Sequence, residues 1–359
     1  MHTLLLIMKT IILTGGGTGG HVIPNLSLIP ILRKYFDRIV YIGCSNSIEK
    51  KLISEEKGII FEEIPATKLE RDKLYKLPLV PFKLLNSVCK AKKIIKKYKP
   101  NVIFSKGGFV SVPVCIAGKL LKINVISHES DLTLGLSNKI IYKFCSRFCT
   151  TFEKTAQNLK KAVYTGSPIR KTLLHGNKQK GLEITKLNSN KPILLVTGGS
   201  TGAKKLNDII ENSFKELIKT FNIIHLTGKN KKTNLENSPY YCQMEFCSEI
   251  EHLLVLADVV ISRAGSNAIC ELFFLNKPMI LIPLSNKASR GDQVENAEYF
   301  KSLKVCEVLQ ESKLTTSSLL TTLEKIIKNK ETYIKNMKNS NLKLNGEENI
   351  VKEILKFTK

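Results

Sequence analysis

Short apolar runs alternate with amphipathic stretches along the whole chain. In the first half these runs predict buried strands near residues 10–14, 39–42, 60–64, 102–104, 125–127 and 148–151. The pattern restarts at 193–197 and continues near 223–226, 259–261 and 279–282. Apolar strands separated by helices are typical of a parallel sheet covered on both faces. The pattern therefore predicts an α/β protein with doubly wound parallel sheets.

Two glycine-rich loops of one design lie roughly half a chain apart, at residues 15–21 and 198–203. Each follows a predicted strand and precedes a stretch with helical periodicity. Bare glycine backbone lets a ligand approach closely, and the N–H groups and dipole at a helix start favour negative charge. We therefore expect two cradles for phosphate or sugar, on two nucleotide-type domains that face one cleft.

The length of 359 residues favours two domains, each large enough to bury its own core. The boundary is best placed at residues 166–168, because a polar stretch from 175 to 191 follows them. We expect an N-terminal domain over 1–165 and a C-terminal domain over 166–341. An amphipathic pattern at 350–355 predicts one last helix within 342–359.

The chain is strongly basic, with 56 Lys and Arg against 31 Asp and Glu and a net charge of +25. Such an excess favours a polyanionic partner, either nucleic acid or an anionic membrane. Residues 68–99 carry eleven of the basic residues and two acidic ones, interleaved with leucine. One interpretation is contact with an anionic bilayer through Lys73, Leu74, Lys76, Leu77, Leu79, Val80, Phe82 and Lys83. The other is a helix that buries its leucines in the core and solvates its lysines.

Several classes of function lose support from the composition. The chain has no tryptophan and no aromatic motif for stacking bases, so we expect no nucleic-acid partner. No apolar run is long enough to span a membrane, and Lys9 interrupts the first one. Nine cysteines without a Cys-x-x-Cys spacing suggest reduced thiols in the cytosol. The histidines are scattered and no Asp-x-Asp occurs, so we expect no metal site.

A dinucleotide enzyme is the first alternative for the glycine loops. Gly15, Gly17 and Gly20 satisfy Gly-x-Gly-x-x-Gly, which alone is a weak signal. An NAD site also needs an acidic residue at the end of the second strand, and residues 41–45 contain none. The second loop lacks the Gly-Lys-Ser/Thr ending of a P-loop. Both the dehydrogenase and the nucleotide-hydrolase interpretations are therefore disfavoured.

Four further motifs place polar groups where a nucleotide sugar could bind. Small residues from 262 onward follow a strand, and Glu271 comes in the next helix, where its carboxylate can accept ribose hydroxyls. Residues 128–131 (His-Glu-Ser-Asp) follow another strand directly, at the edge where open α/β sheets bind ligands. Arg170 at the domain boundary suits a diphosphate. Gln293 and Asn296 are amides at helical spacing that suit sugar hydroxyls.

Taken in order, these motifs resemble the MurG family of glycosyltransferases, glycosyltransferase family 28. Members add N-acetylglucosamine to the undecaprenyl-diphosphate-linked muramoyl peptide in peptidoglycan synthesis. The resemblance runs over nearly the whole chain and implies the GT-B fold, UDP-N-acetylglucosamine as donor, and inversion without a covalent intermediate. It also implies no cofactor, a last helix that packs back on the N-terminal domain, and a peripheral location at the cytoplasmic face of the inner membrane. Related GT-B enzymes that glycosylate diacylglycerol remain an alternative.

The resemblance also implies roles for single residues. Thr18, Gly19 and Gly20 would line the donor sugar and the acceptor diphosphate. Arg170 and Ser200 would contact the donor phosphates, and Glu271 would hold the uridine ribose. The remaining donor contacts would be the backbone of Cys247 at the uracil, the backbone of Ser266, Asn267, Ala268, Ile269 and Cys270 at the diphosphate, and the side chains of Gln293 and Asn296 at the sugar. Two motifs depart from the family pattern: Ser130-Asp131 replaces Gln-Asn in one, and Asp292 replaces Gln in the other. The donor contact expected of Asp131 is weakened because a carboxylate cannot donate a hydrogen bond as an amide does.

The expected reaction needs a base for the acceptor hydroxyl and donors that stabilise the departing diphosphate. We favour His21 as the base, with Glu129 as its competitor or partner. The alternative for His21 is a residue at a helix start that only positions the acceptor phosphate. For His128 we expect a buried, hydrogen-bonded histidine rather than a catalytic one.

Overall fold

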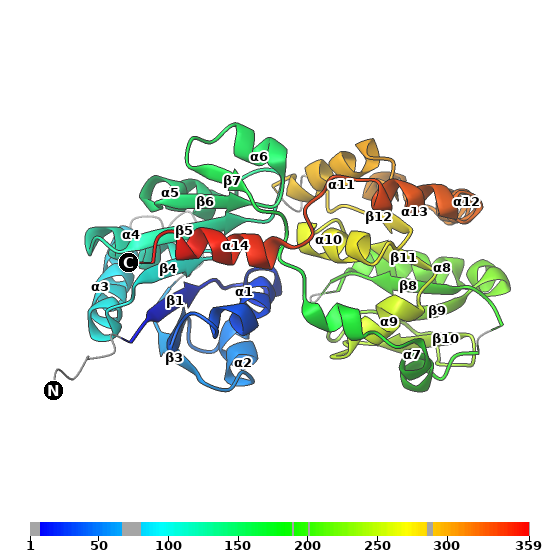
Figure 1. The fold of residues 1–359 in the computed structure, drawn as a ribbon. Coiled ribbons are helices and arrows are strands. Elements are labelled where there is room, and N and C mark those ends of the chain that lie inside the picture. The colour runs from blue at the N-terminus through cyan, green and yellow to red at the C-terminus, as the bar shows by residue number, and fades with distance from the viewer. Residues whose placement is uncertain (1–7, 67–79, 189, 200–201, 286–289, 359) are drawn as a thin grey trace. The chain divides into compact units, whose positions relative to one another are not determined.

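The computed structural model describes residues 8–66, 80–188, 190–199, 202–285 and 290–358 (Figure 1). The chain divides into two compact units. The first unit comprises Met1–Ile169 and Lys343–Lys359, and the second comprises Arg170–Leu342. The division falls between Ile169 and Arg170, and the chain returns to the first unit for its last helix.

The first unit is built on a seven-stranded sheet in the order β3-β2-β1-β4-β5-β6-β7. All of its strand pairs are parallel. The strands are β1 (Thr10–Thr14), β2 (Arg38–Gly43), β3 (Ile59–Glu63), β4 (Val102–Ser105), β5 (Asn124–Glu129), β6 (Arg147–Thr150) and β7 (Ala162–Tyr164). The helices are α1 (Gly19–Leu32), α2 (Ile48–Ser54), α3 (Val80–Tyr98), α4 (Ser111–Leu120), α5 (Leu136–Phe144), α6 (Glu153–Gln157) and α14 (Gly346–Leu355).

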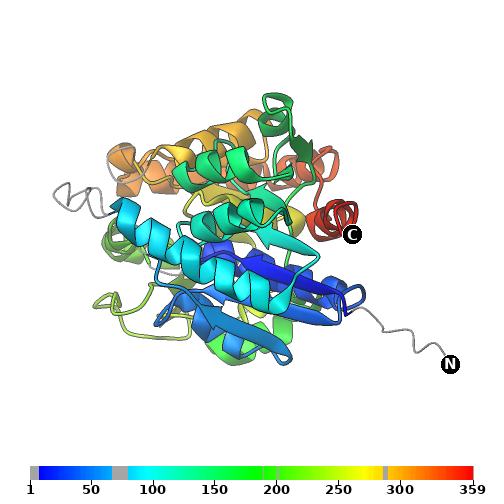
Figure 2. The same cartoon turned by 90° about the vertical axis from the view of Figure 1, so that its left-hand side faces the viewer.

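Two layers of helices cover the first sheet, because successive strand residues point to opposite faces. On one face Ile12 packs with α3, α4 and α5, which lie side by side in Figure 2. On the other face Ile11 and Leu13 pack with α1 and with Ile350 and Ile354 of α14. Helix α14 therefore belongs to the core of the first unit.

The second unit repeats this architecture with a six-stranded parallel sheet in the order β10-β9-β8-β11-β12-β13. The strands are β8 (Ile193–Thr197), β9 (Asn222–Leu226), β10 (Tyr241–Met244), β11 (Val259–Ser262), β12 (Met279–Leu281) and β13 (Cys306–Val308). The α-helices are α7 (Lys178–Thr185), α8 (Lys204–Thr220), α9 (Ile250–Leu256), α10 (Ser266–Phe274), α11 (Asp292–Ser302), α12 (Thr316–Lys328) and α13 (Lys330–Lys338). The 3₁₀ turns are η2 (Lys171–His175) and η3 (Glu311–Lys313).

The predicted fold class of doubly wound parallel sheets is confirmed, with three additional strands. These are β7, β10 and β13, each of which lies at an edge of its sheet. They have three or four residues, and most of those residues are only partly buried. A strand this short at a sheet edge needs no continuous apolar run, so the sequence pattern does not mark it.

Each glycine loop lies at the topological switch point of its sheet, where the strand order reverses. In the first sheet β1 lies between β2 and β4, so the chain leaves β1 toward one side and β4 toward the other. Strand β8 has the same position between β9 and β11 in the second sheet. Ligands of open α/β sheets bind outside the carboxyl ends of strands at such switch points. We therefore expect ligands near the residues that follow β1, β4, β8 and β11.

Helix α3 has features expected from both interpretations of the basic segment, a core helix and a membrane contact. Its later residues Val88, Ala91 and Ile95 are buried in the core, and most of its lysines are exposed. At its start Phe82 is 72% exposed and Leu85 is 61% exposed. The predicted contacts Lys73, Leu74, Lys76, Leu77 and Leu79 lie outside the described residues. None of the helices described is long and apolar enough to cross a membrane.

Candidate active site

The first glycine loop is packed directly against a second pair of glycines that follows β4. Gly17, Gly107 and Gly108 have φ values of +88°, +89° and +83°, where only glycine is unstrained. A Cβ on Gly108 would collide with the backbone oxygen of Gly16. A Cβ on Gly17 would lie 2.5 Å from the Phe109 ring. Glycine at these positions lets the loops after β1 and β4 meet at the switch point.

Thr18 and His21 form a hydrogen-bonded pair at the start of α1. Thr18 is the residue before the helix and has an extended backbone, with φ −151° and ψ 156°. Its hydroxyl does not cap the helix and lies 3.0 Å from Nδ1 of the half-buried His21. When Nδ1–H donates to this hydroxyl, Nε2 carries the lone pair that a general base needs. The contact with the Thr18 hydroxyl therefore restrains the orientation of the imidazole.

Glu129 is occupied in shaping the loop that follows β5. Glu129 is buried, with 5% of its surface exposed. Oε1 accepts the N–H of Asp131 at 3.1 Å. Oε2 accepts the N–H of Gly135 at 3.0 Å and the side-chain amide of Asn138 at 3.0 Å. These bonds fix residues 130–135 at the carboxyl edge of the sheet.

His128 is buried and hydrogen-bonded on both ring nitrogens. Lys106 donates to Nδ1 at 2.9 Å, so Nε2 carries the proton and donates to the Gly166 oxygen at 3.1 Å. Burial, and then the charge of Lys106, hold the pKa of His128 well below its ordinary value. The neutral imidazole is a structural element that connects β5 to the 165–167 segment.

Lys106 is a functional candidate that the sequence analysis did not single out. Lys106 is buried, with 1% of its surface exposed, and its ammonium also donates to the Ser130 hydroxyl. Serine at position 130, where the family pattern has glutamine, therefore accepts a hydrogen bond from Lys106. A lysine directly after a buried strand at the switch point, in the run Ser105-Lys106-Gly107, was the signal available in the sequence.

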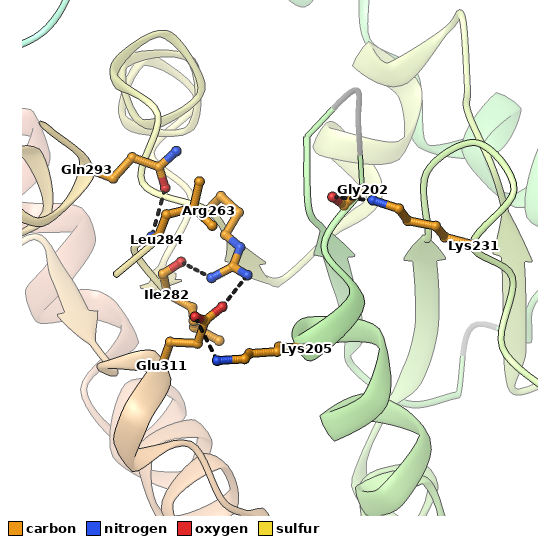
Figure 3. Close-up of polar contacts among 8 residues, drawn as sticks. All are labelled: Gly202, Lys205, Lys231, Arg263, Ile282, Leu284, Gln293 and Glu311. Carbon is orange, nitrogen blue, oxygen red and sulfur yellow. Dashed lines mark hydrogen bonds and ion pairs between the residues drawn. The ribbon is translucent and has the colours of Figure 1, made fainter. Parts of the chain in front are cut away.

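The second glycine loop is described on both sides of residues 200–201, and Ser200 lies outside the described residues. Gly199 and Gly202 have φ values of +79° and +66°. A Cβ on Gly202 would collide with the backbone at Thr227, so this loop too packs closely on its neighbour. Lys231 donates to the Gly202 oxygen at 3.2 Å (Figure 3).

Helix α10 begins directly after the turn that leaves β11. Gly265 precedes it with an extended backbone, and the first intrahelical bond runs from the Ile269 N–H to the Gly265 oxygen. The N–H groups of a first helical turn and the helix dipole favour an anion at this end. The first turn contains no acidic residue that would compete for it. The backbone predicted to bind diphosphate, Ser266, Asn267, Ala268, Ile269 and Cys270, forms this start.

Arg170 and Glu271, predicted to bind different parts of the donor, bind each other. Nε of Arg170 donates to Oε1 at 2.6 Å and its terminal nitrogen donates to Oε2 at 2.6 Å. The side chains are 26% and 14% exposed. Burial alone would lower the pKa of Arg170, but the hydrogen bond and charge of Glu271 outweigh it and raise that pKa. This bidentate geometry fixes the orientation of the Glu271 carboxylate.

A buried ionic network supports the turn before α10 (Figure 3). Arg263 follows β11, is 7% exposed, and donates to the Ile282 oxygen at 3.1 Å and to Oε1 of Glu311 at 2.5 Å. Lys205, in the first turn of α8, donates to Oε2 of Glu311 at 3.3 Å. Glu311 therefore ties the start of α8 to the turn that leads into α10. Sequence reasoning missed it, because it lies 48 residues from Arg263 with no local pattern.

The side-chain amides of Gln293 and Asn296, near the start of α11, form hydrogen bonds with backbone groups. Oε1 of Gln293 accepts the Leu284 N–H at 3.0 Å (Figure 3). Asn296 is fully buried and donates to the Ala264 oxygen at 3.4 Å. Oδ2 of Asp292 lies 3.6 Å from Nε of Arg290, so the two side chains form an ion pair. Cys247, half-buried, follows the 71% exposed Phe246.

Two family models match most of the chain. The N-terminal domain of glycosyltransferase family 28 matches residues 11–150, and its C-terminal domain matches residues 193–354. The chain belongs to glycosyltransferase family 28. The family predicted from the motifs is confirmed. Three of the six motifs, the two glycine loops and the residues from 262 onward, follow strands at the two switch points.

Curated family-28 relatives cover nearly the whole chain. A protein of Clostridium tetani is 50% identical over 353 residues, which are 97% of this chain and 98% of the relative. A protein of Clostridium botulinum (strain 657) is 49% identical over 356 residues, 98% of this chain and 100% of the relative. Both are named UDP-N-acetylglucosamine–N-acetylmuramyl-(pentapeptide) pyrophosphoryl-undecaprenol N-acetylglucosamine transferase.

Solved structures share the fold of this family-28 chain. Acinetobacter baumannii MurG superposes with a TM-score of 0.72 at 22% identity, covering 97% of this chain and 99% of that one. UDP-GlcNAc 2-epimerase from Neisseria meningitidis superposes with a TM-score of 0.69 at 16% identity, covering 97% and 100%. The architecture is therefore GT-B. In the parts of this family-28 chain that the structure describes, no group of three or more His, Cys, Asp or Glu residues could hold a metal ion.

Proposed function

We propose that this chain transfers N-acetylglucosamine from UDP-N-acetylglucosamine to the 4-hydroxyl of the muramoyl sugar of undecaprenyl-diphosphate-MurNAc-pentapeptide. The product is the lipid-linked disaccharide used for peptidoglycan. The observation that carries the proposal is 50% identity, over nearly the full length of both chains, to a relative named for this transfer. The enzyme is a hexosyltransferase that forms a β-1,4 linkage.

We propose that the second unit binds the donor. The N-terminus of α10, with Ser200 of the second glycine loop, would hold the diphosphate. Glu271 would accept hydrogen bonds from the ribose hydroxyls, and the backbone of Cys247 would bind the uracil. Gln293 and Asn296 would bind the sugar, directly or by fixing the backbone at Leu284 and Ala264.

The role first expected of Arg170 changes with its observed partner. Both nitrogens that face Glu271 are engaged at 2.6 Å, so this guanidinium is directed at the carboxylate rather than at a phosphate. We propose that Arg170 orients Glu271 toward the ribose. A planar guanidinium that holds both carboxylate oxygens leaves their outer lone pairs for the two ribose hydroxyls.

We propose that the first unit supplies the base and binds the acceptor near Thr18, Gly19 and Gly20. The acceptor O4 attacks the anomeric carbon, and its proton passes to Nε2 of His21. The bond from that carbon to the UDP oxygen breaks, and UDP leaves from the opposite face with inversion. The N–H groups at the start of α10 and the hydroxyl of Ser200 stabilise the charge on UDP. Glu129 shapes the 130–135 loop rather than acting as the base, and Asp131 is part of that loop.

We propose that the protein works peripherally at an anionic membrane, on the cytoplasmic face of the inner membrane. The support is the exposed start of α3, where Phe82 and Leu85 stand out beside Lys83 and the helix carries many more lysines. Apolar side chains in the interface and lysines at the headgroups are the usual basis of such binding. We propose no nucleic-acid partner and no metal cofactor, since helix-terminal N–H groups and a hydroxyl supply the charge stabilisation.

The test is transfer of labelled N-acetylglucosamine from its UDP donor to a short-chain muramoyl-pentapeptide lipid diphosphate. Diacylglycerol serves as a parallel acceptor, and EDTA is present in half of the samples. We expect transfer to the muramoyl lipid alone, at the same rate with EDTA. Transfer to diacylglycerol alone would retain the GT-B enzyme and reject the substrate. A rate abolished by EDTA and restored by a divalent cation would reject metal independence.

Replacing Glu271 by glutamine is expected to raise the Kd for UDP by about 10- to 100-fold, because hydrogen bonds to a charged acceptor each contribute about 1.5–3 kcal/mol. Titration calorimetry with UDP measures this change. Glu324→Gln is the matched control, since Glu324 is exposed on α12 and should leave the Kd unchanged. Equal UDP affinity in Glu271→Gln and the parent protein would remove Glu271 from the donor site.

A further inference from the structure

Glu49 is a buried carboxylate that lies outside the residues proposed to bind the substrates. It lies in the first turn of α2, and its residue is fully buried. Oε2 accepts the N–H of Gly17 at 3.2 Å, and Oε1 accepts the N–H of Cys44 at 3.2 Å. Among the residues that the structure describes, no basic side chain forms an ion pair with Glu49. Its charge is therefore met by backbone N–H groups of two different loops.

An isolated carboxylate is a costly group to bury, because it loses its hydration and gains no opposite charge. An apolar side chain would fill the same space at lower cost. Hydrogen bonds to a charged acceptor contribute more than bonds between neutral groups, which makes a carboxylate suited to holding backbone in place. The two bonds of Glu49 connect the loop after β1 with the residue that follows β2.

The first glycine loop is enclosed between Glu49 and Phe109. A Cβ on Gly16 would lie 2.5 Å from Oε1 of Glu49, and a Cβ on Gly17 would lie 2.5 Å from the Phe109 ring. Gly17 has a φ of +88°, and its N–H is directed at Glu49. The carboxylate therefore fixes the Gly16–Gly17 peptide plane, one peptide before the bond that joins Gly17 to Thr18.

We infer that Glu49 is a positioning residue for glycosyl transfer, which fixes the first glycine loop so that Thr18 holds His21 in its working orientation. Thr18 follows Gly17 directly, and its hydroxyl lies 3.0 Å from Nδ1 of His21. A rotation of the Gly16–Gly17 peptide would be transmitted through the Gly17 backbone, move the Thr18 hydroxyl and change the orientation of the imidazole. This inference rests on the proposed function, in which His21 is the base.

The first variant is Glu49→Gln, which keeps the shape of the side chain. Only one of its two terminal atoms can accept, so its NH₂ group would face either the Gly17 or the Cys44 N–H and displace that loop. We expect kcat at saturating donor and acceptor to fall by about tenfold or more, as misplacement of a catalytic group does. The Kd for UDP should stay within about twofold, because the proposed donor site lies in the other unit. Glu55→Gln, an exposed change directly after α2, is the control that should keep full kcat.

A double-mutant cycle separates positioning from general destabilisation. Because Glu49 is proposed to act through Thr18, the losses in kcat caused by Glu49→Gln and Thr18→Ala should combine to less than their product. Fully multiplicative losses would overturn the inference. If Glu49→Gln no longer binds UDP, Glu49→Asp, which keeps the charge on a shorter chain, takes its place in the cycle.

The outcomes also distinguish this inference from the proposed function. No transfer by the parent protein to either acceptor rejects the proposed function. Normal transfer by the parent protein together with a kcat within about twofold in Glu49→Gln rejects the role of Glu49 alone.

Discussion

Replacement of His21 by alanine is expected to lower kcat by about 10²- to 10⁴-fold, the range that a positioned general base contributes. The Thr18 hydroxyl, 3.0 Å from Nδ1, can hold the tautomer that leaves the Nε2 lone pair for the acceptor proton. The proposed donor site lies in the other unit, so the Kd for UDP should stay within about twofold. Transfer kinetics at saturating substrates and calorimetric titration with UDP measure the two quantities on one preparation.

The kinetic form of the His21→Ala defect decides between the two roles considered for His21. A base acts only in the transition state, so its loss lowers kcat. A residue that only positions the acceptor phosphate would raise the acceptor KM and leave kcat at saturation near that of the parent protein. His175→Ala is the control, because His175 is exposed on η2 and has no proposed role. An unchanged kcat in His21→Ala would remove His21 as the base.

Replacement of Glu311 by alanine is expected to destabilise the second unit by about 3–5 kcal/mol, because it leaves the buried Arg263 without its counter-charge. The two side chains are 9% and 6% exposed and meet at 2.5 Å. Nε of Arg263 is buried and has no hydrogen-bond partner among the residues described, so within that part of the chain the guanidinium would retain little besides the Ile282 oxygen. Urea denaturation followed by circular dichroism measures the loss.

Lys205→Ala is the matched control for Glu311→Ala. Lys205 bonds the other oxygen of Glu311 at 3.3 Å, but its side chain is 68% exposed. Solvent screens such a pair, and its removal should cost about 1 kcal/mol or less. Similar losses in the two variants would contradict the assignment of Arg263 as the decisive partner. Because the network leads into α10, Glu311→Ala should also weaken UDP binding.

The stabilisation from Glu311 should depend on pH in a defined direction. Burial alone would raise the pKa of Glu311, but the hydrogen bonds and charges of Arg263 and Lys205 outweigh it and lower that pKa from 4.5. A depressed folded pKa means that the contribution is present above the unfolded pKa and is lost as the pH falls through the folded pKa. The difference in stability between the parent protein and Glu311→Ala should therefore be constant near neutrality and shrink below pH 4.5.

The fold was largely predictable from the chain because its central strands are continuous apolar runs. Ile11, Ile12 and Leu13 are all fully buried, since helices cover both faces of the sheet. Glycine loops at both switch points were also visible, since close packing excludes a Cβ at Gly16, Gly17 and Gly202. The short edge strands escaped prediction, because half-buried segments of three or four residues carry no distinct pattern.

The supporting residues of the site were much harder to predict than the motifs. Residues 41–45 contain no acid, yet Glu49 on α2 accepts a hydrogen bond from the first glycine loop. Glu311 reaches Arg263 across 48 residues of chain. Tertiary packing brings such partners together, and no local sequence spacing predicts their contact. The pairing of Arg170 with Glu271 was missed for the same reason, although both residues were named.

The most direct test of the proposed function is the structure of the product, determined by NMR after reaction of UDP-N-acetylglucosamine with the short-chain muramoyl-pentapeptide lipid diphosphate. We predict one N-acetylglucosamine on O4 of the muramoyl sugar, with the large anomeric coupling of a β linkage and one UDP released for each linkage. An α linkage, a sugar on another hydroxyl, or release of free N-acetylglucosamine without transfer would contradict the proposed inverting reaction.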